Sequence, residues 1–247
     1  MSFLLLIIFS LTGGLGAVLL SSIFFVFPAR VRDILVPCLI SYSTGTFLGL
    51  AFLGLIPNAL LGLPVETATK TVLGGIVLFF TLEKFLIWHH CHDETCEGHG
   101  ATVPIILVGS GVHDMIDGIN IAAAFVASVP LGIATSIAII AHEVPKDVGN
   151  SAILLQQGLS RKKALLLNAL ASLTTLVGAV LAYLYLSEVR RVVPYVMALS
   201  AGNFIYMSVA HLVPHLHRYG KISQSFRQVA LLLLGIGTIA FLRMHHH

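Results

Sequence analysis

The chain has 247 residues, of which 57% are hydrophobic and only 10% are charged, and its mean hydropathy is +0.94. These values exclude an ordinary soluble domain, because a solvated surface needs about a quarter of the residues to be charged. The formal net charge of +3 comes without a cluster of lysines and arginines, so nucleic-acid binding is not expected. The composition predicts a helical membrane protein.

Long apolar stretches separated by polar residues divide the whole chain. A membrane-spanning helix needs roughly 20 apolar residues, and none of the stretches alternates as the strands of a membrane barrel do. We therefore expect an all-α integral membrane protein, one transmembrane domain over residues 1–247, with eight helices at 3–27, 34–60, 71–88, 103–127, 130–157, 161–186, 192–215 and 226–243. The fourth and fifth are the least hydrophobic, so hydropathy should rate them weakest.

The basic residues between these helices indicate the orientation of the chain. Eight spans place both termini on one side, and the loops richer in lysine and arginine face the cytosol. Placing both termini on the non-cytosolic side gives nine basic residues inside and four outside, which is the arrangement we expect. The inner nine are Arg30, Arg32, Lys84, Arg161, Lys162, Lys163, Arg218, Lys221 and Arg227, and the outer four are Lys70, Arg190, Arg191 and Arg243.

The second and seventh helices share a sequence pattern. Gly45, Phe47, Leu48, Ala51, Leu55, Ile56, Pro57 and Asn58 match Gly202, Phe204, Ile205, Ser208, Leu212, Val213, Pro214 and His215 at the same spacing. The two helices cross the membrane in opposite senses, so we expect an inverted repeat that relates helices 1–3 to helices 6–8 around helices 4 and 5. Secondary transporters commonly have such symmetry. The alternative is that small residues and prolines recur in any helix bundle because they allow close packing.

Two helices carry charged residues in their interior. The fourth contains H-D-M-I-D-G at 113–118, and the fifth contains H-E-V-P-K-D at 142–147. Residues four apart share a helix face, so His113 should point the same way as Asp117. A carboxylate inside a bilayer is costly unless it is paired or coordinated, and it therefore marks a functional site. Because a tight turn near 128–130 joins the two helices, we expect one cluster between them.

The donors of this cluster suit a divalent metal ion. Zinc, iron(II) and manganese accept imidazole nitrogen together with carboxylate oxygen. Pro145 also leaves the carbonyl group of Ala141 without its helical donor, at the depth of the cluster. One alternative is a set of buried polar residues that only satisfy one another. Another is a metallopeptidase of the HExxH type, but Lys146 stands where its second histidine is needed.

The two motifs resemble those of the ZIP (Zrt- and Irt-like protein) family of divalent metal transporters. Residues 113–118 resemble the family's H-N-x-x-D-G, and residues 142–150 resemble its H-E-x-P-H-E-x-G-D. The resemblance covers nearly the whole chain, including the eight spans and a polar loop between helices three and four. It implies transport of zinc, and often iron, manganese or cadmium, toward the cytosol. It also implies dimers and an elevator-like movement of helices one, four, five and six.

The resemblance further implies which residues bind metal. The primary metal would be held by His113, Asp117 and His142, and a secondary metal would be surrounded by Asp114, Glu143 and Asn168, with Asp147 in support. Three positions depart from the family pattern: Asp114 replaces an asparagine, Asn150 replaces an aspartate, and Lys146 replaces a histidine or glutamate that bridges the two metals.

Lys146 is the most consequential of these departures. A protonated ammonium has no lone pair to offer a cation. Ionised Asp114, Asp117 and Glu143 carry −3, Lys146 reduces this to −2, and one divalent ion neutralises the remainder. We therefore predict a single-metal centre in which Lys146 fills the secondary site. The alternative is a neutral lysine, favoured by burial, that acts as a ligand.

Other metal-binding side chains lie outside these two helices. A polar loop at 89–100, on the side assigned to the cytosol, either handles metal or has no function; its candidate ligands are His89, His90, Cys91, His92, Cys96 and His99. His211 and His215, at the end of the seventh helix, line the transport pathway or are ordinary interfacial residues. The terminal residues His245, His246 and His247 are native or belong to a purification tag, and we assign them no role.

The sequence thus predicts a zinc transporter of the plasma membrane and not an enzyme. A partly dehydrated divalent ion would bind at mid-membrane, with zinc as the main cargo, Fe²⁺, Mn²⁺ or Cd²⁺ as others, and no organic cofactor. One alternative is an intramembrane zinc hydrolase in which the same residues activate water. Another is a proton-linked channel in which the acids form a relay. The expected partners are metal ions, the lipid bilayer and a second copy of the chain.

Overall fold

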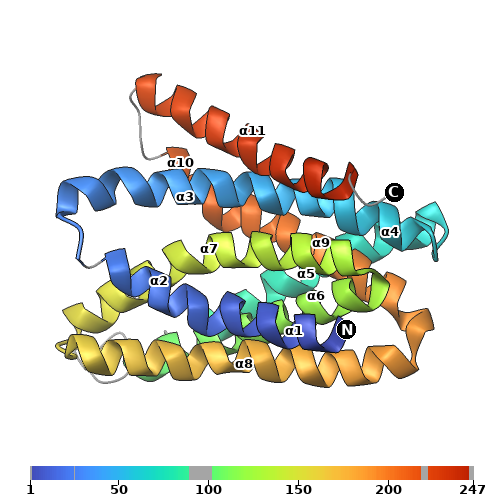
Figure 1. The fold of residues 1–247 in the computed structure, drawn as a ribbon, viewed down its shortest axis with the longest axis horizontal. Helices are drawn as coiled ribbons and strands as arrows, with labels where there is room; N and C mark the ends of the chain where they lie inside the picture. Colours follow the sequence, from blue (N-terminus) through green and yellow to red (C-terminus); the bar gives the residue numbers. More distant parts are fainter. Residues whose placement is uncertain (1, 25, 89–101, 218–221, 245–247) are drawn as a thin grey trace.

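The computed structural model describes all residues except 1, 25, 89–101, 218–221 and 245–247, and the described residues form helices and no strands (Figure 1). Helical structure occurs at each of the eight predicted positions. In chain order the elements are α1 Ser2–Leu11, η1 Thr12–Gly16, α2 Ala17–Phe24, α3 Ala29–Gly49, η2 Leu50–Leu55, α4 Ile56–Leu60, α5 Val65–Trp88, α6 Thr102–Ala127, α7 Val129–Gln156, α8 Arg161–Glu188, η3 Arg190–Val192, α9 Val193–Tyr206, η4 Met207–Leu212, α10 Val213–His217 and α11 Ile222–Met244.

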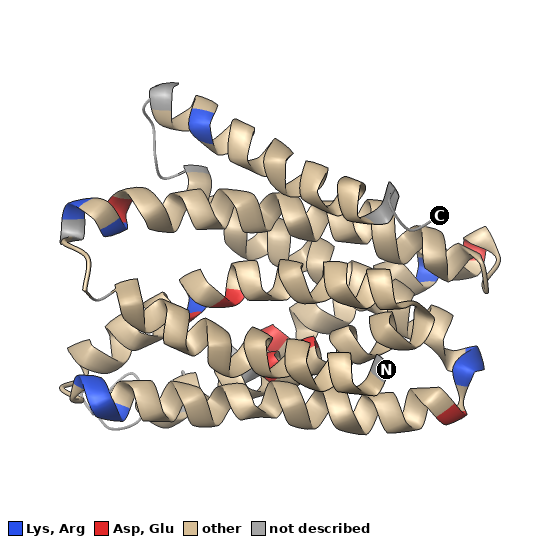
Figure 2. Ribbon diagram, in the orientation of Figure 1, with Lys and Arg blue, Asp and Glu red and all other residues tan. Residues whose placement is uncertain are grey.

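Six of the described helical segments are long and apolar enough to cross a membrane. They are Phe3–Phe24, Arg30–Leu60, Val65–Phe85, Arg161–Glu188, Arg190–Leu212 and Gln224–Leu242. Most lysines and arginines lie near the ends of helices, whereas acidic residues also lie in the middle of the bundle (Figure 2). The prediction of an all-α membrane protein is therefore confirmed, while the count of eight spans stays a prediction.

Glycines bring two helices of the bundle into backbone contact. A Cβ atom on Gly118 of α6 would collide with the carbonyl oxygen of Thr175 in α8, and one on Gly178 of α8 would collide with that of Met115 in α6. Glycine is required at both positions because it alone has no Cβ. The α6 helix, which carries half of the expected site, is thus fixed against α8.

Similar crossings occur on the other side of the bundle. In the same way, a Cβ on Gly45 of α3 would meet the backbone of Leu232 in α11, and one on Gly202 of α9 would meet the backbone of Val72 in α5. Figure 1 shows α11 beside α3 at one side, α8 at the opposite side, and α7 between them. Close backbone contacts therefore join α6 with α8, α3 with α11 and α5 with α9, and α7 lies between α3 and α8.

The helices α3 and α9 have the same irregularity. Each is followed by a π-helical segment, η2 or η4, that begins three residues after a phenylalanine of the shared sequence pattern, Phe47 or Phe204. These two rings are buried, and their centroids lie 4.6 Å apart. The two helices therefore change from α to π geometry at positions that the sequence pattern pairs.

Candidate metal centre

A tight turn places the two polar helices side by side. α6 ends at Ala127 and α7 begins at Val129, with Ser128 in an extended conformation between them. The Ser128 hydroxyl caps α7 by accepting a hydrogen bond from the backbone N–H of Leu131 at 3.3 Å. Since so short a connection reverses the chain, α6 and α7 run antiparallel, and their histidine motifs face each other.

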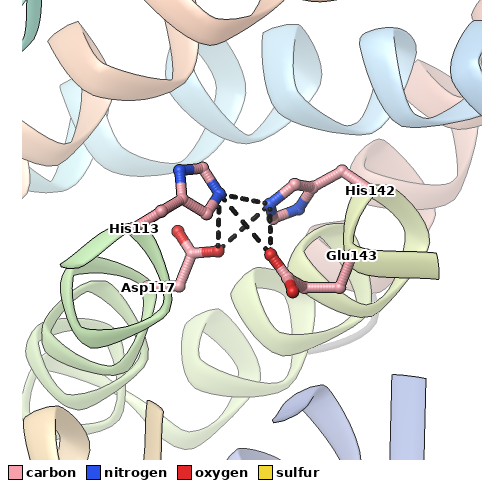
Figure 3. Close-up of side chains that lie close together, drawn as sticks. All are labelled: His113, Asp117, His142 and Glu143. Carbon is pink, nitrogen blue, oxygen red and sulfur yellow. Dashed lines mark hydrogen bonds and ion pairs between the residues drawn. The ribbon is translucent and has the colours of Figure 1, made fainter. Parts of the chain in front are cut away.

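Four side chains of these helices meet at one point, and we call them the primary cluster: His113, Asp117, His142 and Glu143 (Figure 3). One ligand atom from each lies within 4.8 Å of the other three. The Nε2 atom of His142 lies 3.1 Å from His113 Nε2, from Asp117 Oδ2 and from Glu143 Oε1. His113 Nε2 lies 3.6 Å from Asp117 Oδ2 and 3.5 Å from Glu143 Oε1.

These separations fit a single metal ion. Ligand atoms about 2.0–2.1 Å from a zinc ion lie roughly 3.3–3.4 Å apart when they form a tetrahedron. The five separations that involve a histidine nitrogen are 3.1–3.6 Å, and the two carboxylate oxygens lie within 4.8 Å of each other. The spacing of these two nitrogen and two oxygen donors is therefore compatible with zinc coordination.

Glu143 lies in the primary cluster and also contacts Lys146. The resemblance placed Glu143 beside the secondary site, whereas its Oε1 atom belongs to the primary cluster and its carboxylate also contacts Lys146 Nζ at 2.8 Å. Asp114 is not one of the four residues of the primary cluster and forms an ion pair with Lys146. The ammonium group of Lys146 thus lies between the two carboxylates expected around a second metal.

The other residues named for the secondary site are buried near these helices. Asn168 of α8 donates a hydrogen bond from Nδ2 to Ser151 Oγ at 2.7 Å and is not part of the primary cluster. Three buried oxygens, Asp114 Oδ2, Asp147 Oδ2 and Asn168 Oδ1, accept no hydrogen bond from the described residues. Unpaired buried oxygens are costly. These three oxygens can therefore still accept a hydrogen bond or bind a cation.

Pro145 removes the helical hydrogen-bond donor of the Ala141 carbonyl group. This carbonyl group nevertheless has a hydrogen-bond partner. Ser43 of α3 donates a hydrogen bond from Oγ to this carbonyl oxygen at 2.6 Å. The aromatic ring of Phe47, one turn further along α3, lies against the His142 ring with centroids 4.4 Å apart. Sequence reasoning named neither residue as part of the site, because no motif reports which helix packs on α7.

A cavity of about 410 Å³ lies beside the primary cluster and is lined by His113. Its lining comes from the second half of α5, the first half of α6, the second half of α7 and the α9–η4 segment, so it extends toward the end where α5 finishes and α6 begins. His113 and Lys146 lie at its inner part, and Glu83 and His211 also line it. The buried ring of Phe47 contacts both the His142 ring and the buried ring of Phe204.

His211 is one of the sequence-predicted residues that this cavity reaches. Its Nε2 atom lies 2.8 Å from Glu83 Oε2, which also accepts a hydrogen bond from the Tyr206 hydroxyl at 2.5 Å. The predictions for the loop histidines and cysteines at 89–100 and for the histidines at 245–247 lie outside the described residues, as does the side chain of His215.

The sequence model of the ZIP zinc transporter family matches residues 87–243. This chain belongs to that family. Zinc transporter ZIP6 from Homo sapiens is 31% identical to it over 150 residues, which are 58% of this chain and 20% of ZIP6. Zinc transporter zipt-7.2 from Caenorhabditis elegans is 27% identical over 263 residues (82% and 57%), and zinc transporter ZIP13 from Pongo abelii is 29% identical over 214 residues (80% and 64%).

The chain spans less than two thirds of the length of each of these three ZIP relatives. All three are named transporters and none is named an enzyme. Membership of a family of membrane metal transporters, rather than of an enzyme family, is therefore confirmed.

Proposed function

We propose that the chain transports a divalent metal ion across a membrane and that zinc is its main cargo. The observation that carries this proposal is the primary cluster, in which four ligand atoms lie within 4.8 Å of one another beside a cavity, in a member of the ZIP family. The names of the relatives support zinc as the cargo. Iron(II), manganese and cadmium ions accept similar donors and are secondary candidates.

The geometry favours a carrier over an intramembrane hydrolase. In a hydrolase the Glu143 carboxylate would have to remain free to take a proton from metal-bound water. Instead its oxygens lie 3.1 Å from His142 Nε2 and 2.8 Å from Lys146 Nζ. A carboxylate held among ligands and an ammonium group is suited to binding a cation and poorly suited to acting as a general base.

We further propose that the ion is released to the cytosol, from a transporter of the plasma membrane whose termini lie on the other side. The cavity extends toward the end where α5 finishes and α6 begins. The excess of basic residues in the loops supports a cytosolic location for this end. The pair of His211 and Glu83 on the wall of this cavity supports a role in the release pathway. His215 and the metal-binding residues of the 89–100 loop are proposed for the same pathway on sequence alone.

The single-metal centre remains part of the proposal. Its support is the position of the Lys146 ammonium, which contacts Asp114 and Glu143, the two carboxylates expected around a second ion. The ammonium group of Lys146 neutralises the negative charge of these carboxylates, which a second metal ion would otherwise neutralise. Asp147 and Asn168, which are buried and have oxygens without a hydrogen-bond donor among the described residues, keep a supporting role.

The inverted repeat and the homodimer are proposals of the same kind. The repeat is supported by the paired π-helical segments η2 and η4 and by the paired glycine crossings of α3 with α11 and of α9 with α5. It relates helices 1–3 to helices 6–8, within a count of eight spans. The homodimer rests on the family resemblance, and cross-linking in native membranes tests it.

Zinc uptake into proteoliposomes tests the proposed function. Wild-type protein should give saturable uptake that other divalent ions inhibit, and the substitutions His113→Ala and Asp117→Ala should abolish it, because each removes a ligand atom of the primary cluster. Glu66→Ala is the matched control, since it deletes a carboxylate whose side chain is 78% exposed at the surface of α5. Undiminished uptake in both cluster variants would refute the site, and metal-independent proton flux would favour the channel.

A further inference from the structure

The turn of α7 that carries His142 has one backbone acceptor without a helical donor. Pro145 has no N–H group, so the carbonyl group of Ala141 lacks the hydrogen bond that residue 145 would donate in a regular α-helix. A carbonyl group without a donor is costly in the interior of a membrane, where no water replaces the missing bond. This carbonyl belongs to the residue directly before His142, a ligand of the primary cluster.

Ser43 of α3 supplies the missing donor. Its side chain is fully buried, and its Oγ atom lies 2.6 Å from the carbonyl oxygen of Ala141 and 2.7 Å from that of Leu39. A hydroxyl group has one proton to donate. Leu39 already receives the N–H of Ser43 within the α-helix, whereas Ala141 has no helical donor. The hydrogen bond from the Ser43 hydroxyl group is therefore more stabilising when the Ala141 carbonyl accepts it.

The same face of α3 also contacts the metal ligand itself. Phe47 follows Ser43 by one helical turn, and its ring lies 4.4 Å from the ring of His142. The α3 helix is in turn held against α11 by the close contact of Gly45 with the backbone of Leu232. A rigid neighbour thus holds both the backbone before His142 and the imidazole ring of His142.

We propose that Ser43 is a positioning residue of the metal centre. By bonding to the Ala141 carbonyl that Pro145 leaves open, it fixes the turn of α7 from which His142 and Glu143 reach the ion. This inference rests on the proposed function only in requiring that the primary cluster binds a divalent ion. Groups that orient metal ligands typically change metal affinity by about 10–100-fold when they are removed.

Binding of Co²⁺ to the purified full-length chain in detergent tests the inference, because the visible spectrum of Co²⁺ reports the geometry of its ligands. Ser43→Ala should weaken Co²⁺ binding at least tenfold and alter the spectrum. Ser41→Ala is the matched control: Ser41 is equally buried on α3, and its hydroxyl donates at 2.7 Å to the Pro37 carbonyl of its own helix. This control should leave both the affinity and the spectrum unchanged.

A double-mutant cycle with Pro145→Ala identifies the mechanism. Alanine at 145 restores an N–H donor for the Ala141 carbonyl, so Ser43→Ala should cost little affinity in that background, and a folding defect of Ser43→Ala should be corrected there. Equal Co²⁺ affinities for Ser43→Ala and Ser41→Ala would overturn the inference alone, as would an effect of Ser43→Ala that Pro145→Ala leaves unchanged. Failure of the wild type to bind Co²⁺ or Zn²⁺ would overturn the proposed function and this inference with it.

Discussion

Replacing Lys146 by histidine tests whether an ammonium group takes the place of a second metal ion. Lys146 Nζ contacts Asp114 and lies 2.8 Å from the Glu143 carboxylate, and both acids are 1% exposed. Removing one partner of a buried ion pair costs about 3–5 kcal/mol, because the other charge stays buried and uncompensated. Metal-free Lys146→His should therefore unfold more easily than the wild type by about this amount. Its neutral imidazole also offers a nitrogen lone pair to a second ion where the ammonium group offered none, so the metal count should rise from one to two.

The metal count is measured by elemental analysis of the purified protein, and stability by thermal unfolding with and without zinc. The amount of metal that stays bound to the His113→Ala variant is subtracted from each metal count, because that metal lies outside the primary cluster. Lys70→His is the matched control: Lys70 pairs with Glu66 at 2.5 Å, but their side chains are 73% and 78% exposed, and such surface pairs contribute about 0–1 kcal/mol. Two ions in the wild type, or an unchanged count in Lys146→His, would refute the reasoning.

Two further predictions follow from the cavity and the helix crossings. His211→Ala should slow zinc uptake several-fold while leaving Co²⁺ affinity of the primary cluster unchanged, because His211 lines the cavity and contacts Glu83; a parallel loss of affinity would contradict a role in release. Gly118→Ala should lower stability by about 1–3 kcal/mol, the usual cost of overpacking, because its Cβ would collide with Thr175. Gly109→Ala, whose Cβ would meet nothing within 4 Å, should be tolerated, and equal unfolding temperatures for the two variants would contradict the proposed crossing.

The sequence was informative about the site where the relevant contacts are local. His113 and Asp117 lie four residues apart on one helix, so helical geometry alone brings them together. The short connection at Ser128 does the same for the two helices. The position of Glu143 was less predictable, because a long side chain next to His142 reaches either the primary cluster or Lys146, and the structure shows that it contacts both.

Contacts between distant helices could not be predicted in this way. Ser43 and Phe47 approach α7 across about a hundred residues of sequence, in a helix where other buried hydroxyl groups only bond to their own backbone, as Ser41 does. The contact of Glu83 with His211 is similar, because it depends on how α5 packs beside η4. Hydropathy in turn says least about α6 and α7, because the charges that make a binding site also weaken the apolar signal of a span.

The glycine crossings have a mechanical consequence for any movement of this molecule. Where backbones touch, as at Gly118 with Thr175 or Gly45 with Leu232, only glycine fits the contact, so sliding one helix along the other would bring a side chain into that space. The contact of α3 with α7 includes the hydrogen bond of Ser43 to Ala141 and the ring contact of Phe47 with His142. Sliding of α7 along α3 would break both contacts, so the centre that Ser43 positions is tied to one placement of α7 against α3.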